Sequence, residues 1–177
     1  MSIPTRRRYK GGSAVQYTLS VLVENHAGVL SKISGLFSRR GFNIDSLAVG
    51  VTNNPDVSRI TIVANGDEYV VEQLEKQLNK VIPVIKVKRL AEGEFISREL
   101  ILIKVHCAAS KRAEIIKTAE IMQAKIVDVA PSCVTVEYCE CTNRVNTLID
   151  LLRPYGIREI VRTGTIAIDR GASALSV

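Results

Sequence analysis

Hydrophobic and polar residues follow two periods along the first half of the chain and predict six elements. Alternation with a period of two, or a short apolar run between turn formers, predicts a strand, and apolar residues recurring every three or four positions predict a helix. Val29, Ile33, Leu36 and Phe37 show the helical period. The predicted order is a strand at 17–24, a helix at 29–40, strands at 44–51 and 57–64, a helix at 68–80 and a strand at 81–90.

The second half repeats this order of elements after a short polar break at residues 91–94. Pro131 and Ser132 predict its central turn, and residues 154–156 end its last helix. The predicted elements are a strand at 99–106, a helix at 111–124, strands at 125–130 and 133–139, a helix at 143–153 and a strand at 157–168.

Two successive βαββαβ units give the predicted fold class, which is α+β with two ferredoxin-like domains. In each unit a four-stranded antiparallel sheet carries two helices on one face. The predicted divisions are a basic flexible tail at 1–16, a first domain at 17–92 and a second domain at 93–177. The face without helices needs a cover, and its many β-branched and small residues favour pairing of sheets or edges in a dimer.

Composition and charge narrow the class of protein. The hydrophobic fraction of 46% is sufficient for a packed core, while the longest apolar stretches are too short to cross a bilayer, so we expect no membrane partner. Most of the net charge of +6 comes from the first residues of the chain, here called the leader. This leader could contact an acidic partner or RNA, or it could have no specific role. Its basic residues are Arg6, Arg7, Arg8 and Lys10. Because this leader lacks an apolar segment, it does not resemble a secretory signal, and we expect a cytoplasmic protein, or a protein of the plastid stroma in a photosynthetic eukaryote.

The four cysteines, Cys107, Cys133, Cys139 and Cys141, match no paired CxxC zinc spacing. Cys139 and Cys141 would share one face of a strand, which leaves a metal or redox site open. Free thiols in a reducing compartment are the simpler interpretation.

The βαββαβ order is shared by RNA-binding and amino-acid-sensing modules, so topology alone does not decide the function. RNA recognition needs aromatic residues on the central strands, but residues 57–64 contain none. His26 and His106 form no dyad with a nucleophile by sequence, and no glycine-rich phosphate loop occurs. We therefore expect no nucleic-acid partner, no catalytic residue and no metal site.

The segment Asn25-His26-Ala27-Gly28-Val29-Leu30 joins the first predicted strand to the first predicted helix. A glycine turn that opens a helix exposes backbone N–H groups at the positive end of the helix dipole, where a carboxylate binds well. The structural alternative is that Gly28 permits a tight turn and Asn25 caps the helix. The functional interpretation is a site for a small anionic or zwitterionic molecule.

A free amino acid would satisfy such a site at each of its ends. Its carboxylate would accept from the N–H groups at the helix start, its ammonium would donate to an asparagine oxygen, and its apolar side chain would pack on neighbouring aliphatic residues. The candidate binding residues are Asn25, Gly28, Val29, Leu30, Asn43 and Ile44.

Residues 17–50 closely resemble the ACT domain in the small regulatory subunits of acetolactate synthase, also called acetohydroxyacid synthase. The resemblance covers nearly the whole of 17–170, and its motifs keep the same order. Its further segments are residues 58–62, 66–68, 73–80, 98–104, 124–129 and 156–164.

This resemblance implies a non-catalytic subunit that binds and activates the large catalytic subunit and makes it sensitive to feedback inhibition by valine in branched-chain amino-acid biosynthesis. Thiamine diphosphate, magnesium and FAD would belong to the large subunit. The alternative function is a free-standing ACT-type sensor that regulates transcription or another enzyme. Leucine and isoleucine stay open as effectors, because one or two methylenes are worth only ~1–3 kcal/mol.

The resemblance also implies a homodimer formed through the ACT domains, with the effector at their interface. The loop residues Asn25, Gly28, Val29 and Leu30 of one chain would then face the residues at 43–44 of a second chain. His26 receives no ligand role.

Overall fold

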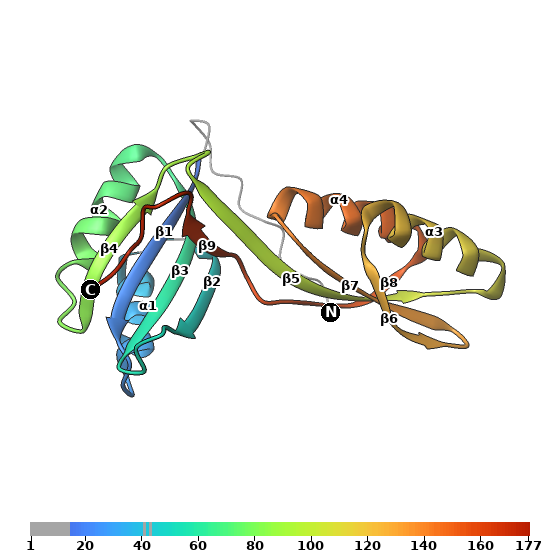
Figure 1. Ribbon diagram of the computed structural model, residues 1–177, viewed down its shortest axis with the longest axis horizontal. Coiled ribbons are helices and arrows are strands. Elements are labelled where there is room, and N and C mark those ends of the chain that lie inside the picture. Colours follow the sequence, from blue (N-terminus) through green and yellow to red (C-terminus); the bar gives the residue numbers. More distant parts are fainter. Residues whose placement is uncertain (1–14, 41, 43) are drawn as a thin grey trace.

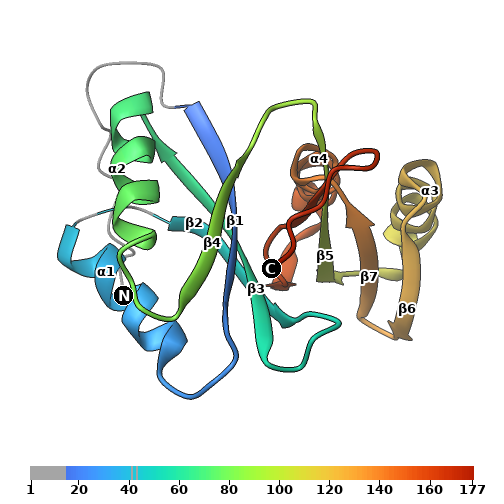
Figure 2. The same ribbon diagram turned by 60° about the vertical axis from the view of Figure 1, so that its left-hand side comes forward.

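The structure of the protein is a computed structural model that describes residues 15–40, 42 and 44–177. Two antiparallel sheets, each with two helices on one face, follow one another along the length of the molecule (Figure 1). A view turned by 60° shows α1 and α2 together on one side of the first sheet (Figure 2). The α+β class with two ferredoxin-like units is therefore confirmed.

The first domain has the predicted order of elements, with β1 and β3 at the centre of its sheet. The strand order across the sheet is β2-β3-β1-β4, so β2 and β4 are its edges. The elements are β1 (Val15–Glu24), α1 (Val29–Arg40), β2 (Ile44–Val51), β3 (Val57–Gly66), α2 (Glu68–Leu78) and β4 (Val84–Leu90). Residues 1–14 of the predicted basic tail lie outside the described residues, and Val15 and Gln16 belong to β1.

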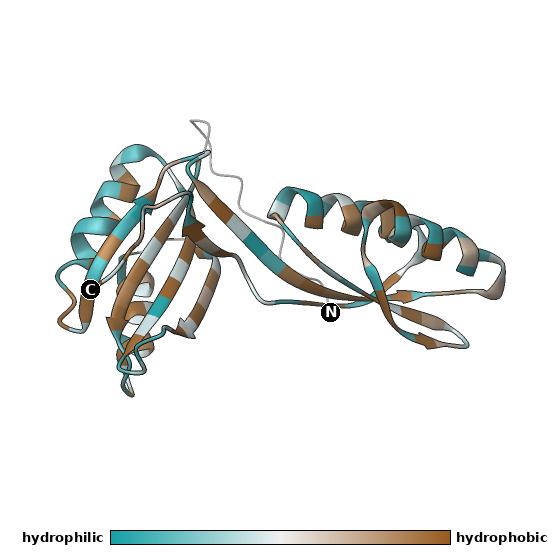
Figure 3. Cartoon of the chain, viewed as in Figure 1, coloured by the Kyte–Doolittle hydropathy of each residue, from teal (hydrophilic) through white to brown (hydrophobic). Residues whose placement is uncertain are grey.

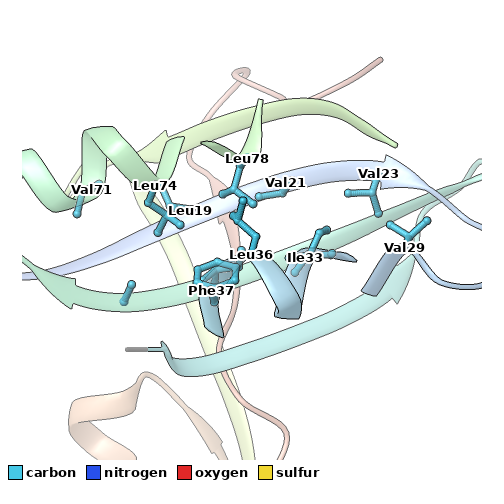
Figure 4. Packing of buried hydrophobic residues seen from close by; sticks show 13 residues of the cluster. Leu19, Val21, Val23, Val29, Ile33, Leu36, Phe37, Val71, Leu74 and Leu78 are labelled. Carbon is cyan, nitrogen blue, oxygen red and sulfur yellow. The ribbon is translucent and has the colours of Figure 1, made fainter. Parts of the chain in front are cut away.

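The core of the first domain lies between this sheet and its two helices, as the hydrophobic periods predict. Alternate residues of β1, from Leu19 to Val23, point at the helices, and the apolar stripe of α1 packs against them (Figure 4). Asp67 caps α2, because its side chain accepts a hydrogen bond of 2.8 Å from the N–H of Val70.

The second domain repeats this arrangement with the strand order β6-β7-β5-β8. Its core lies between the sheet and its two helices and contains Ile101, Ile103 and Val105 of the central strand. None of the described helices is long and apolar enough to span a membrane. The elements are β5 (Phe95–His106), α3 (Arg112–Met122), β6 (Lys125–Ala130), β7 (Cys133–Glu140), α4 (Thr142–Leu152), β8 (Ile157–Arg162) and β9 (Ile166–Asp169).

Several predicted element ends are wrong by a few residues. The helix predicted at 68–80 ends at Leu78, and the strand predicted from residue 81 begins at Val84. The segment between them turns, with the N–H of Val84 donating to the carbonyl of Val81, and Pro83 has no N–H for a strand ladder. The helix predicted at 111–124 ends at residue 122, because Gln123 adopts a left-handed conformation with φ of 63°.

The single strand predicted at 157–168 is also wrong, because the chain forms two strands, β8 and β9, separated by Gly164. β8 pairs with residues 101–105 of β5, whereas β9 pairs with residues 95–98 of the same strand. β5 accordingly begins at Phe95, four positions before the predicted start at 99. It runs from the first domain into the second, and apolar and polar residues alternate along it (Figures 1 and 3). After β8 the chain therefore runs back beside β5 to the first domain, where it forms β9.

Residues 163–177, here called the C-terminal segment, lie across the helix-free face of the first sheet (Figures 1 and 2). The Nζ of Lys88 pairs with Oδ1 of Asp169 at 2.7 Å, and Nη2 of Arg59 donates to the carbonyl of Leu175 at 2.9 Å. The side chain of Leu175 is buried in a small cluster on this face. The face that we predicted to pair with a second copy is thus covered by the chain itself, while the sheet edges stay open to that prediction.

The variant Gly164→Ala is expected to detach the C-terminal segment from β2 and to lower the free energy of unfolding. Gly164 has φ of +81°, and a Cβ at this position would lie 2.7 Å from Oγ of Ser46 and 3.4 Å from the carbonyl oxygen of Leu47. Backbone strain of ~1–2 kcal/mol and a similar overpacking cost predict a loss of about 2–4 kcal/mol. Urea unfolding followed by circular dichroism measures it.

The matched control is Gly171→Ala in the same segment. Gly171 also has a positive φ of 66°, but nothing lies within 4 Å of the place that its Cβ would take, so this variant should lose the strain energy alone. Equal losses in the two variants would contradict a tight crossing of the C-terminal segment over β2.

Candidate effector-binding site

The candidate loop joins β1 to α1 at the end of the first sheet where the β2–β3 hairpin turns. Backbone hydrogen bonds anchor its beginning, since the N–H of Glu24 donates to Pro83 at 2.9 Å and the N–H of Asn25 donates to Asp56 at 2.7 Å. Residues 25–28 are exposed. The loop is therefore fixed where it leaves β1 and open to solvent where it enters the helix.

Gly28 is the last residue before α1, and its φ of 88° lies in the left-handed region that favours glycine. Its carbonyl accepts the first helical hydrogen bond, from the N–H of Lys32 at 3.0 Å. A glycine here has no side chain to accept from the N–H groups of Leu30 and Ser31 in the first turn. Together with the positive dipole end of α1, these donors form a place for a carboxylate.

The Asn25 side chain does not cap α1. Its Nδ2 donates to the carbonyl of Pro55 at 2.7 Å, and its Oδ1 accepts from Oγ of Ser58 at 3.0 Å. Both partners belong to the β2–β3 hairpin. The structural alternative predicted for Asn25, a helix cap, is therefore wrong.

The two apolar residues at the start of α1 differ in exposure. Val29 is 4% exposed and packs into the core near Val23, as Figure 4 shows. Its side chain is therefore separated from the loop surface, and its N–H makes a long contact of 3.5 Å with the carbonyl of His26. Leu30 is 45% exposed and is the apolar side chain that the first turn offers to a ligand or a second chain.

Ile44 lies at the end of the first sheet that is far from the loop. Asn43 is outside the described residues, and Ile44 begins β2 opposite Ala64, with its side chain packed half-buried against the core. The loop lies near the opposite end of β2, where Val51 faces Ser58. One copy of the chain therefore does not bring Ile44 to the loop.

The end of the sheet near Ile44 is held by a cluster of polar and aromatic groups. The Arg89 guanidinium lies 4.4 Å from the centre of the Tyr17 ring and bonds both carboxylate oxygens of Glu68, one of them at 2.9 Å. The hydrogen bond from Arg89 lowers the pKa of the Glu68 carboxyl from its ordinary value. This cluster fixes α2 to β1 and β4 beside the end of the sheet where β2 begins.

His26 lies on the loop with Nε2 3.0 Å from Oε2 of Glu24 and Nδ1 3.0 Å from the carbonyl of Ala27. Both contacts are local, and the side chains are about half exposed. The geometry gives His26 a role in shaping the loop surface.

A hollow of about 770 Å³ lies on the helix-free side of the first sheet. Residues of β1, β2, β3, β5 and the C-terminal segment line it, and none of the predicted binding residues does. The predicted site needs residues of a second chain. One copy therefore carries only half of it, and we expect no enclosed cavity at the loop of a single copy.

The groups at the loop are of the kind that bind a small ligand. Backbone N–H groups, an exposed leucine and a histidine–glutamate pair surround it, and no group of three or more potential metal ligands occurs among the described residues. Sequence reasoning missed Pro55 and Ser58, because their bonds to Asn25 join positions about thirty residues apart. The turn formers at residues 52–56 predicted the hairpin. Nothing in their sequence predicted that the hairpin contacts the loop at residues 25–28.

Comparison with known proteins gives matches over both domains. Residues 19–86 match the family model described as an AHAS small subunit-like ACT domain, and residues 98–171 match the model described as the small subunit of acetolactate synthase. The two models cover the loop, the helix it opens and most of the second domain.

Individual proteins that are similar to this chain carry the same family name as these models. A probable acetolactate synthase small subunit from Archaeoglobus fulgidus is 50% identical over 157 residues, which are 89% of this chain and 98% of that protein. The acetolactate synthase small subunit of Mycolicibacterium smegmatis is 48% identical over 88% of this chain and 91% of its own length. The crystal structure of an acetolactate synthase small subunit from Thermotoga maritima matches with a TM-score of 0.83 and 37% identity, over 90% of this chain and 99% of that one.

Proposed function

The chain belongs to the family of acetolactate synthase small subunits, and we propose that it binds the catalytic large subunit, raises its activity and confers feedback inhibition by valine. The observation that carries this proposal is the glycine turn at Gly28 that opens α1, inside a domain that matches the ACT domain of this family. A helix start with free N–H donors suits the carboxylate of an amino acid.

Catalysis in this proposal resides in the large subunit, which holds thiamine diphosphate, magnesium and FAD. The small subunit contributes regulation of the shared first step toward the branched-chain amino acids. The matches of relatives named as small subunits support this division of labour and favour it over a free-standing amino-acid sensor.

The effector site is proposed to form between the ACT domains of two copies. β2 is an edge strand, and the loop lies near its Val51 end while Ile44 begins its other end. If the β2 strands of two copies ran antiparallel, each Ile44 would come to the end of the sheet where the loop of the other copy lies. Asn43 and Ile44 of one copy would then complete the half-site formed by Gly28, Leu30 and the first turn of α1 of the other.

Valine regulates the enzyme in this proposal by binding one arrangement of the two ACT domains more tightly than another. A ligand shifts an equilibrium only as far as its affinity for the two states differs. The large subunit would respond to the arrangement that is populated. β5 and the C-terminal segment connect the two domains and are the elements that would transmit the change.

The cytoplasm is the proposed location, or the plastid stroma if the source is a photosynthetic eukaryote. All four cysteines are free thiols, which suits a reducing compartment.

Adding the purified chain to a cognate catalytic large subunit is expected to raise the rate of acetolactate formation until the binding sites are saturated. The measurement is the rate at fixed pyruvate and increasing chain concentration, with an unrelated protein of similar size as the control. A rate that stays the same at every concentration would contradict the proposal that this chain is an activating subunit.

A further inference from the structure

The side chain of Asn25 is committed to contacts within its own chain. A carboxamide offers N–H donors and an accepting oxygen, and here one donor bonds Pro55 at 2.7 Å while the oxygen accepts from Ser58 at 3.0 Å. The backbone N–H of the same residue donates to Asp56 at 2.7 Å. Three hydrogen bonds from one residue therefore clamp the start of the loop to the β2–β3 hairpin.

The hairpin turn is a rigid base for this clamp because it is held by its own hydrogen bonds. Oγ1 of Thr52 donates within the turn, and the N–H of Asn54 donates back to that oxygen at 3.2 Å. Oδ1 of Asn54 accepts from the N–H of Asp56 at 3.0 Å. The turn thus has internal hydrogen bonds in addition to those that it makes with the loop.

Ser58 is placed under the loop and away from solvent. It is 6% exposed and lies opposite Val23 on β1, whose side chain points toward the helices. Its hydroxyl therefore reaches Asn25 from the core side. A ligand on the exposed side of the loop does not touch Ser58.

We propose that Ser58 and Asn25 are positioning residues, which hold the loop so that the N–H groups at the start of α1 face the effector. This inference rests on the proposed function and assigns to Asn25 a supporting role in place of direct contact with the ammonium. The β2–β3 hairpin thereby becomes part of the effector site. Loss of the clamp would let the loop start move and would misalign the donors that follow Gly28.

The variant Ser58→Ala is expected to raise the L-valine concentration for half-inhibition of the reconstituted enzyme by about 3–10-fold, the equivalent of one neutral hydrogen bond. Titration calorimetry of L-valine with the full chain should show the same loss of affinity. Ser58→Thr restores a hydroxyl and should recover most of it. Amide hydrogen exchange of residues 25–30 without valine should be faster in Ser58→Ala than in the wild type.

The matched control is Ser20→Ala. Ser20 is also a buried strand serine of the first sheet, at 2% exposure, but its Oγ has no hydrogen-bond partner in the described structure. Its replacement should leave the affinity for L-valine and the exchange of residues 25–30 unchanged. A loss caused by any buried serine-to-alanine change would appear in both variants.

The variant Asn25→Asp separates a positioning role from direct binding. A carboxylate at this position would bind an ammonium at least as well as the amide does, but it has no N–H for Pro55 and would place an anionic oxygen against that carbonyl. A positioning role predicts weaker valine inhibition by more than about tenfold, since one bond is lost and a repulsion is added. Direct binding predicts unchanged or tighter inhibition.

The outcomes distinguish the two proposals. If the wild-type chain binds L-valine and Ser58→Ala binds it equally well, the positioning role is overturned and the proposed function stands. Unchanged or tighter inhibition in Asn25→Asp overturns it in the same way. A wild-type chain that neither binds L-valine nor confers inhibition overturns the proposed function and this inference with it.

Discussion

Replacing Gly28 by aspartate is expected to abolish valine inhibition of the reconstituted acetolactate synthase. The new carboxylate would lie at the start of α1, where the carboxylate of the effector is proposed to bind, and like charges at such a distance cost several kcal/mol, so the half-inhibiting valine concentration should rise at least ~100-fold. Nothing lies within 4 Å of a Cβ at this position, and aspartate tolerates a positive φ better than most residues, so the variant should fold. The measurement is the rate of acetolactate formation against valine concentration.

Gly28→Ala is the matched control, because alanine brings the backbone strain of a side chain at positive φ without a charge or an oxygen that could accept from the N–H groups of the first turn. It should retain much more valine sensitivity than Gly28→Asp. Equal loss in both variants would show that the backbone conformation, and not a carboxylate site, determines inhibition. Full sensitivity in Gly28→Asp would make the assigned site wrong.

Replacing Arg162 by methionine is expected to lower the stability of the second domain, because it leaves a buried carboxylate without its partner. Nε and Nη2 of Arg162 each lie 2.7 Å from an oxygen of Glu99, which is 4% exposed. This hydrogen bonding raises the pKa of the Arg162 guanidinium. Because Arg162 itself is about one third exposed, its loss leaves the buried Glu99 carboxylate without its partner at a cost of ~1–3 kcal/mol. For a domain of fewer than about 100 residues, that corresponds to a fall in Tm of about 4–24 °C.

The double variant Glu99→Met with Arg162→Met provides the test of this cause. The double variant removes the buried carboxylate together with its partner, so it should be more stable than Arg162→Met alone. Arg158→Met on the same strand, whose exposed side chain bonds His106, should cost less than about 1 kcal/mol. Additive losses in the double variant would contradict an interaction between Glu99 and Arg162.

The regular elements of both domains could be predicted because each depends on contacts between near neighbours in the sequence. The stripe of α1 and the alternation of β1 are properties of single segments, and both lie where predicted. β9 was missed because four residues show too little alternation to be separated from β8, and because its partner residues 95–98 lie about seventy positions away. The cover over the first sheet depends on this pairing, so it was missed as well.

The candidate site likewise has features that the local sequence predicts and features that depend on distant contacts. A glycine at a helix start is a local signal, and Gly28 has the left-handed conformation that such a turn needs. The bonds from Asn25 to Pro55 and Ser58 depend on how β3 lies beside the loop, which no short segment encodes. The distance of Ile44 from the loop follows from the antiparallel register of β2 and β3, and this register makes a second chain necessary for the proposed site.

The most direct measurement of the central claim is the rate of acetolactate formation by the catalytic large subunit over a range of valine concentrations, with and without this chain. The proposal that this chain is the valine-sensing regulatory subunit predicts that valine lowers the rate in the presence of the chain and leaves the large subunit alone unaffected. A large subunit that is inhibited equally in both cases, or a reconstituted enzyme that valine does not inhibit, would contradict it.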